Sequence, residues 1–363
     1  MIEINDIRDS KEFKSTTFSE FKKTDAKKEL LSSLYNSKIE PACYWSAEFI
    51  CAGHYSDLWD IIILFFSKNI HIGNPKLITY IDLRISNFKE IQRNGYSAEG
   101  MAIRMRNNEK IRKLFAEVIC VLCEAKKRHD LTDVKVPHSE FDLTVMTDRL
   151  KASSAYFAQD FFLKDDPKEF FIASNELAYS ISTEGKNNMD ACYWTEWINE
   201  YAAVCKQKKD KKNSKCDRRT FAEVESKSQM DVVWLVWDSF LNESKKRNLL
   251  VQRLVKTALR VFCFRYTQCC YRKRKFLLYF VIELFTEPFS TEEEIVRDKT
   301  IVVNVINNIH TIYKQIKLNE HSPGTDYLYQ NVNASNLEKT IAILETMNSL
   351  GEEYTPRTSS TNK

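Results

Sequence analysis

Glycine and proline are scarce in this sequence of 363 residues, with only 7 of each. Strand-rich proteins use these residues in their tight turns, whereas long helices with few breaks do not need them. Apolar runs of about 18 residues, which a membrane-spanning helix requires, are also missing. The apolar fraction of 43% is nevertheless that of a globular chain with a large core. The sequence therefore predicts an all-α protein without a membrane span.

Signatures of secretion and catalysis are missing as well. The first 25 residues lack the apolar core of a signal peptide, so we expect the 10 cysteines to be free thiols in an intracellular, reducing compartment. Cys120 and Cys123 have half of a zinc-binding spacing, but no second pair completes the ligand set, and buried thiols are the favoured interpretation. No local pattern couples a cysteine to a histidine for nucleophilic catalysis, and we expect His54 and His71, near predicted helix ends, to have capping or surface roles. We expect a non-enzymatic protein without metal, cofactor or small-molecule substrate.

A short phrase, Ala-Cys-Tyr-Trp, occurs at residues 42–45 and again at 191–194. Cysteine, tyrosine and tryptophan are uncommon residues, so chance explains the repeat poorly. Further markers recur around both copies in the same order: Glu29-Leu30 with Glu176-Leu177, Trp59-Asp60 with Trp237-Asp238, and Arg112-Lys113 with Arg274-Lys275. These markers predict a tandem duplication of a helical unit, with the helices stacked in a bundle or collar-like array. The alternative is that such pairs recur by accident in helical proteins.

The predicted units cover residues 26–130 and 168–290, and hydrophobic periodicity places helices throughout them, including helices at 77–92 and 249–266. We expect Trp45, Trp59, Trp194 and Trp237 to be core anchors, with interface anchors as the alternative, because tryptophan is enriched at binding hot spots. The remaining predicted segments are a polar N-terminal lead (1–25), a connector (131–167), a mobile basic insertion inside the second unit (206–229), C-terminal helices (291–350, with one helix at 292–317 and one at 336–350) and a disordered tail (351–363).

Positive charge is concentrated in one part of the chain. Residues 206–275 contain 20 lysines and arginines against 7 acidic residues, although the whole chain has a net charge of only +4. Within it, residues 245–275 contain no acidic residue, and on a helix one side would carry Lys246, Arg253, Lys256 and Arg260. Such a stretch can track phosphates without reading bases. An acidic protein partner and a solvated face are the alternatives. The candidate contact residues are Lys208, Lys209, Lys211, Lys212, Arg218, Arg219, Lys246, Arg253, Lys256, Arg260, Arg272, Lys273 and Arg274.

One segment, residues 41–75, resembles the helical collar of clamp loaders and related replication–recombination AAA+ ATPases. In that family an Ala-x-Tyr-Trp helix, a glycine break and a Ser-Glu-Asp-Ile-Gly-x-x-Asn/Asp-Pro turn follow one another. Here the phrase beginning at Ala42 leads to Gly53 and then to the turn that ends at Pro75, with Lys68 where the family has an acid. A P-loop is missing, because the only Gly-Lys pair, at Gly185, lacks the rest of the motif. The resemblance implies oligomerising helices without ATP hydrolysis.

The lysine- and asparagine-rich texture of the chain resembles uncharacterised proteins of nucleocytoplasmic large DNA viruses, in stretches such as 73–77 and 165–169. That resemblance implies the host cytoplasm, a viral factory or the virion as the location. Our leading hypothesis is a non-enzymatic scaffold or assembly protein that acts through protein–protein contacts or self-association, a candidate minor capsid component. The alternative is a collar-like replication accessory protein that contacts nucleic acid through its basic segment.

Overall fold

The computed structural model describes residues 2–9, 11–96, 101–128, 131–141, 146–208, 214–268 and 270–321, together with residues 341 and 344. Within these residues the fold is all-α, as predicted, and the only β-type pairing is an isolated bridge between Thr16 and Lys22. No described helix combines the length and apolar character that crossing a membrane requires. Residues 1–4 and 8–320 form one compact body, which contains every helix named below.

The first helical unit consists of α1 (Lys23–Tyr35), α2 (Ile39–Cys51), α3 (Tyr55–Asn69), α4 (Leu77–Arg93), the short α5 (Met101–Arg104) and α6 (Glu109–Glu124). The second consists of α8 (Phe171–Ile181), α9 (Asn188–Gln207), α10 (Val233–Lys245), α11 (Leu249–Cys263) and α12 (Cys270–Thr286), and α13 (Lys299–Lys317) follows it. Short 3-10 turns are η1 (His71–Gly73), η2 (Met105–Asn107), η3 (His138–Phe141), η4 (Thr147–Arg149), η5 (Lys168–Phe170) and η6 (Ser226–Ser228).

The helix ends follow local sequence signals. Side chains of Asn108, Asn187 and Asn248 accept hydrogen bonds from the first turns of α6, α9 and α11, which satisfies backbone donors that have no partner inside the helix. Ala52 ends α2, and Gly53 comes next with a φ of +75°, a value that glycine adopts readily. The last described helix begins at Lys299, later than the predicted start near residue 292, because Asp298 caps it there.

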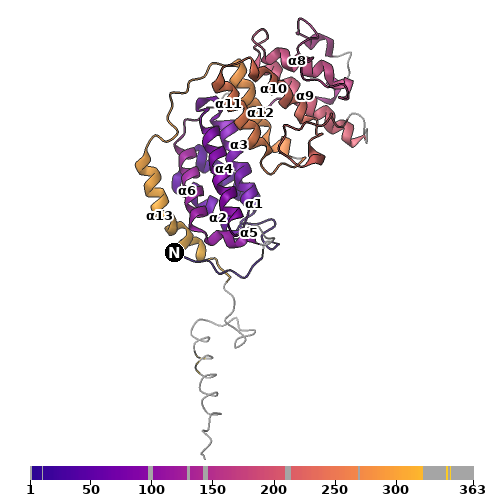
Figure 1. Ribbon diagram of the computed structural model, residues 1–363. Coiled ribbons are helices and arrows are strands. Elements are labelled where there is room, and N and C mark those ends of the chain that lie inside the picture. The colour runs from indigo at the N-terminus through magenta and orange to yellow at the C-terminus, as the bar shows by residue number, and fades with distance from the viewer. Residues whose placement is uncertain are drawn as a thin grey trace, which may run out of the picture. The chain divides into compact units, whose positions relative to one another are not determined.

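The two helical units pack their helices in the same order. In the first unit α2 packs on α1, α3 and α6, and α4 packs on α3 and α6. In the second unit α9 packs on α8, α10 and α12, and α11 packs on α10 and α12. The units meet where α3 packs on α12 and α4 packs on α11, while α13 covers α6 and α2 (Figure 1).

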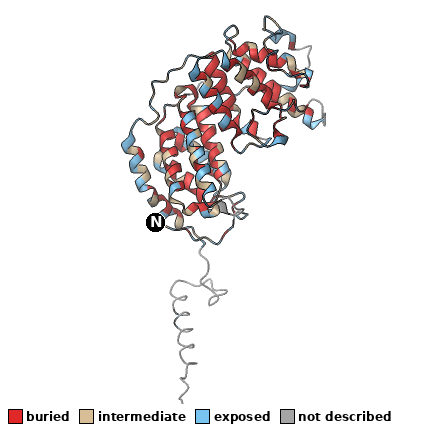
Figure 2. Cartoon of the chain, viewed as in Figure 1, coloured by how far each residue is buried: buried red, intermediate tan, exposed pale blue. Residues whose placement is uncertain are grey.

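Both units contain many buried side chains, and so do segments that the sequence analysis placed outside the core (Figure 2). Trp59, Trp194 and Trp237 are at most 1% exposed, as expected of core anchors. Trp45 is only partly buried and lies at the rim, where its ring packs edge-on against Phe21 with the ring centroids 5.2 Å apart. The N-terminal lead is not merely polar, since its side chains Ile4, Phe13 and Phe18 are buried in the core.

The connector and the basic insertion are both anchored to the second unit. In the connector, the carboxylate of Glu176 accepts hydrogen bonds from the backbone N–H groups of Lys151 and Ala152. The insertion was expected to be mobile over residues 206–229, but it begins inside α9, and within residues 214–229 the side chains of Cys216 and Ala222 are buried. The predicted helix at 336–350 and the predicted tail at 351–363 lie outside the described residues, apart from positions 341 and 344.

Candidate functional site

The predicted basic surface divides into buried, paired and unpaired cations. Arg219 and Arg274 are each only 3% exposed, so the prediction that they contact an external partner is wrong for both. Burying a guanidinium requires partners for its charge and its donors, and each of the two arginines has them. Both therefore act inside the fold rather than on its surface.

Arg219 joins the insertion, the connector and α10. Its Nη2 group lies 2.6 Å from Oδ2 of Asp166, and its Nε group pairs with Oδ2 of Asp238. Its backbone N–H donates to the carbonyl of Gln229, and Nη1 donates to the carbonyl of Asp217. This ion-pair cluster fixes residues 214–229 against the second unit.

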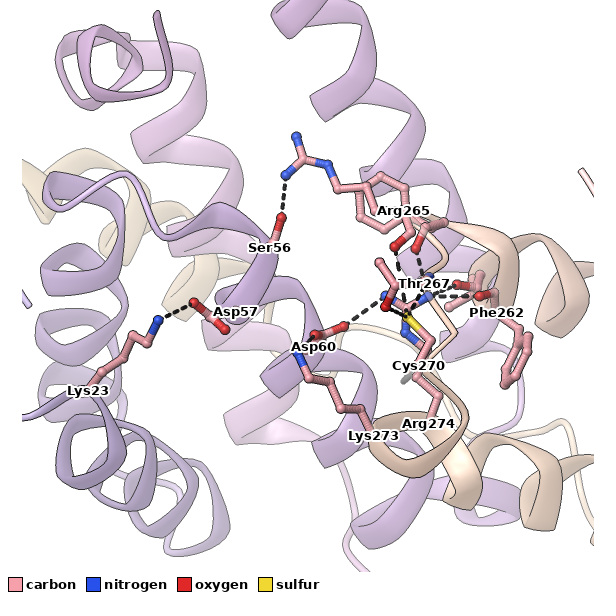
Figure 3. A network of polar contacts seen from close by, with 12 residues as sticks. Lys23, Ser56, Asp57, Asp60, Phe262, Arg265, Thr267, Cys270, Lys273 and Arg274 are labelled. Carbon is pink, nitrogen blue, oxygen red and sulfur yellow. Dashed lines mark hydrogen bonds and ion pairs between the residues drawn. The ribbon is translucent and has the colours of Figure 1, made fainter. Parts of the chain in front are cut away.

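Arg274 lies where the two units meet (Figure 3). Its Nη1 group donates to the carbonyls of Phe262 at 2.8 Å and Phe264 at 2.7 Å, at the end of α11. Its Nη2 group pairs with Asp60 on α3 at 2.8 Å. The backbone of Arg274 itself leaves helical geometry, with φ of −114° and ψ of 16°, which marks a kink in α12. Arg274 therefore ties the α11–α12 connection of the second unit to the first.

Further cations reinforce the contact between the two helical units, which we call the joint. Nζ of Lys273 lies 3.0 Å from the other oxygen of Asp60, and the hydrogen bond to Asp60 raises the pKa of Lys273. Arg260 on α11 pairs with Asp82 on α4 at 2.7 Å. Arg265 donates to the hydroxyl of Ser56 on α3 (Figure 3). We call Arg260, Arg265, Lys273 and Arg274 the joint cations.

Two other predicted contact residues have acidic neighbours within the second unit. Arg272 is 64% exposed and lies 4.0 Å from Glu200, and Lys246 is 57% exposed and lies 3.7 Å from Glu243. Lys246 caps the end of α10, so it does not continue the stripe of α11 as the sequence suggested. Lys208 is exposed at the end of α9. The predicted residues Lys209, Lys211 and Lys212 lie outside the described residues.

The remaining cations gather around a groove. Arg253 and Lys256 are exposed on the outer face of α11, and no described acidic residue pairs with either. Beside them a cavity of about 600 Å³ opens between α10, α11 and the loops at 160–163 and 218–221. Arg218, Lys245 and Lys256 line this cavity and are all exposed. We call it the α10–α11 groove.

Arg218 is held in place at the edge of the groove. Its Nε group donates to Oε1 of Gln229 at 2.6 Å, and its Nη2 group donates to the hydroxyl of Ser226 at 3.3 Å. Within the described part of the chain these bonds leave Nη1 without a hydrogen-bond partner. A guanidinium held in this way loses little further freedom when it binds an anion, and its planar donors match phosphate oxygens.

Acidic groups moderate the charge of the groove. Asp160 and Asp238 line it together with the cations. Burial raises the pKa of Asp238 to about 6, although the hydrogen bond and the charge of Arg219 oppose that shift. Asp238 is therefore partly protonated near pH 6, and the groove becomes more positive as the pH falls below that value.

The thiols of Cys120 and Cys123, which have half of a zinc-binding spacing, lie in the interior. The pKa of the Cys120 thiol is raised to about 11 and that of Cys123 to about 12, in both cases chiefly by burial. Such thiols carry little of the reactive thiolate at neutral pH. No group of histidine, cysteine and carboxylate side chains among the described residues could hold a metal ion.

Sequence reasoning missed several features of the site. His71 was expected at a helix end or on the surface, but it is fully buried, with Nδ1 2.8 Å from Oε2 of Glu283 on α12. Lys245, Phe221 and Gln252, which line the groove, were not candidates. Lys245 could have been included because it begins the acid-free basic stretch. No local pattern marks Phe221 or Gln252.

Comparisons with known proteins give no relative for this arrangement. No protein-family model, no curated protein and no solved structure matches the chain. The resemblances to clamp-loader collars and to large-DNA-virus proteins therefore stay predictions. The function has to be argued from the joint and the α10–α11 groove themselves.

Proposed function

We propose that this chain is a non-enzymatic helical scaffold protein that binds the phosphate backbone of nucleic acid in its α10–α11 groove. The observation that carries the proposal is the contrast within the basic stretch. The joint cations pair with partners inside the fold. By contrast, Arg253 and Lys256 have no described acidic partner, and Lys256 lines the α10–α11 groove together with Arg218 and Lys245. Exposed cations along a groove attract a polyanion without requiring a particular base sequence.

A salt-dependent binding assay tests this proposal. Fluorescence anisotropy with labelled duplex and single-stranded oligonucleotides at 50 and 200 mM salt, concentrations chosen to expose phosphate contacts, should detect binding that weakens with salt. The double variant Lys245→Glu with Lys256→Glu should weaken it by at least about tenfold, because phosphate contacts dominate such affinity. The matched control is Lys299→Glu with Lys314→Glu, which makes the same charge change at exposed positions of α13. Absence of binding at low salt, or an equal loss in the control, would contradict the proposal.

The second candidate function is assembly through protein–protein contacts, including self-association. Exposed apolar side chains on and after α13 favour it, since Val303 is 53% exposed and Leu318 is 85% exposed. Light scattering across a concentration series measures the oligomeric state. A Val303→Glu variant should reduce self-association if α13 takes part. A protein that is monomeric throughout would count against self-association. The proposed settings, a large DNA virus or a replication complex, stay predictions.

We also propose that the two helical units are tandem copies. Buried positions of α1 and α8 correspond at one constant spacing: Ala26, Leu30, Ser33 and Leu34 with Ala173, Leu177, Ser180 and Ile181. The repeated phrase has the same ring geometry in both copies, with Tyr–Trp interplanar angles of 82° and 81°. A crystal structure would test this, because superposing its two helical units should place the backbone of Trp45 on that of Trp194 and the backbone of Trp59 on that of Trp237. Backbone positions that do not correspond for these pairs would contradict the duplication, whereas the difference in burial between Trp45 and Trp194 would not.

A further inference from the structure

The floor of the α10–α11 groove is apolar, which phosphate binding alone does not explain. Phe161, Phe221 and Leu259 line it, and Leu163 in the same lining is 41% exposed. A partly buried ring such as Phe221 offers a flat apolar surface, and it is steadied by an edge-on contact with Trp234, whose ring centroid is 6.3 Å away. The bases of a duplex are stacked and paired, so they cannot reach such a floor. An unstacked base can.

Polar side chains line the groove together with these apolar residues and the cations. Thr220, Asn242 and Gln252 line the groove. Within the described residues no hydrogen bond occupies the side chains of Thr220 and Asn242, and Gln252 uses its amide nitrogen to donate to the carbonyl of Arg247. The amide oxygen of Gln252 therefore stays available as an acceptor. Hydroxyl and amide groups in the same lining as an apolar surface suit the edges of a nucleobase, which carry both donors and acceptors.

The size and the charge of the groove fit the same ligand. Its volume of about 600 Å³ lies within the range of pockets that enclose a single small ligand, so it suits one or a few bases rather than the width of a double helix. Arg218, Lys245 and Lys256 are the exposed cations around it, and Arg253 continues along the outer face of α11. A strand whose bases turn inward can keep its phosphates on these cations.

We propose that the α10–α11 groove binds single-stranded nucleic acid by taking unstacked bases onto its apolar floor, with Phe221 as the stacking residue. This inference rests on the proposed function and narrows it from phosphate binding to one form of nucleic acid. Arg218, Lys245 and Lys256 hold the backbone, while Asn242 and Gln252 contact base edges without selecting one sequence.

A competition experiment on the full chain distinguishes insertion of bases into the groove from binding of phosphates alone. A labelled single-stranded oligo(dT) is displaced by unlabelled oligo(dT), by a blunt duplex of equal length and by an abasic strand of equal length. We expect oligo(dT) to compete at least about tenfold better than either of the other two, because only oligo(dT) offers stacking surfaces. Equal competition by the duplex or by the abasic strand would overturn base insertion and leave phosphate binding intact.

Two matched variants test the stacking residue. Phe221→Leu keeps an apolar side chain but removes the ring, and it should weaken oligo(dT) binding by about fivefold to a hundredfold while leaving duplex binding unchanged. The control Phe21→Leu removes a ring of the N-terminal lead that also packs edge-on against a tryptophan, Trp45, and that does not line the groove, so it should leave oligo(dT) binding unchanged. Thermal melting verifies that both variants are folded.

Three other outcomes would also be decisive. An unchanged affinity for oligo(dT) in folded Phe221→Leu would overturn the stacking role. Poly-glutamate that competes as well as oligo(dT) would identify an acidic protein as the partner and overturn the inference. No binding of any oligonucleotide at low salt would overturn the proposed function itself, together with the inference that rests on it.

Discussion

The joint cations and the cations around the α10–α11 groove (Arg218, Lys245, Arg253 and Lys256) come from the same basic stretch of sequence. They differ in how far side chains and carbonyl groups of the fold pair with them. Arg274 is buried and its partners include carbonyl oxygens and Asp60, whereas Lys256 is exposed and has no described acidic partner. A cation inside a protein needs compensation, because an unpaired buried charge is costly. The density of positive charge along a sequence therefore does not measure the positive charge on a surface. Acidic residues from distant helices decide how much of it remains available.

The largest expected effect comes from the joint. Arg274→Met removes the hydrogen bonds to the end of α11 and leaves Asp60 without its buried partner. We expect a loss of about 3–5 kcal/mol in the free energy of unfolding, as for other broken buried ion pairs. Urea denaturation measures it. The matched control Arg253→Met, on the exposed face of α11, should change stability by no more than about 0.5 kcal/mol. Equal effects in the two variants would erase the distinction between joint and groove.

A pH-dependent effect follows from Asp238, which lines the groove. Its pKa is about 6 in the folded protein and about 4 in the unfolded chain. The folded state therefore holds this proton more tightly, and the contribution of Asp238 to stability falls as the pH rises from about 4 to 6. The fall should be on the order of 2 kcal/mol. Asp238→Asn should lack it when urea denaturation at pH 4.5 and 7 is compared with the wild type, and an unchanged difference would contradict the assignment.

A smaller effect is expected at the exposed edge of the joint. Arg260 is 48% exposed and pairs with Asp82, and exposed ion pairs contribute only about 0–1 kcal/mol. Asp82→Asn should therefore lower the free energy of unfolding by less than about 1 kcal/mol, and added salt should reduce the difference. Denaturation at low and high salt checks this. A loss as large as that of Arg274→Met would mean that the exposed pair is as important to the joint as the buried one.

The smallest effect on stability is expected in the groove. Lys245→Glu with Lys256→Glu changes exposed side chains that have no described acidic partner, so the free energy of unfolding should shift by less than about 0.5 kcal/mol. Thermal melting and urea denaturation check this. A large destabilisation would show that these lysines, like the joint cations, support the fold.

Periodicity and capping residues carried most of the fold prediction. The predicted helices at 77–92 and 249–266 correspond closely to α4 (77–93) and α11 (249–263), because their buried residues repeat with helical spacing. The late start of α13 was missed because the capping role of Asp298 was not recognised. Element positions of this kind depend on neighbours in the sequence, so local patterns suffice to find them.

The site was predicted only in part, because its partners are distant in the sequence. Arg274 and Asp60 are 214 positions apart, and no local pattern says that one will bury the other. The same holds for His71 and Glu283. The sequence placed a basic surface on α11, which contains Arg253 and Lys256, but it also included Arg219 and Arg274. Separating the two groups required the tertiary packing.

The most direct test of this account compares two charge reversals in one nucleic-acid binding assay. Lys245→Glu with Lys256→Glu changes the groove, and Arg272→Glu with Lys273→Glu makes the same change in total charge at and beside the joint, where both side chains are more than half exposed. The groove variant should lose at least about tenfold in affinity while keeping its stability. The joint variant should keep its affinity to within about threefold at 0.15 M salt. An equal loss of affinity in both variants, or the greater loss in the joint variant, would contradict the account.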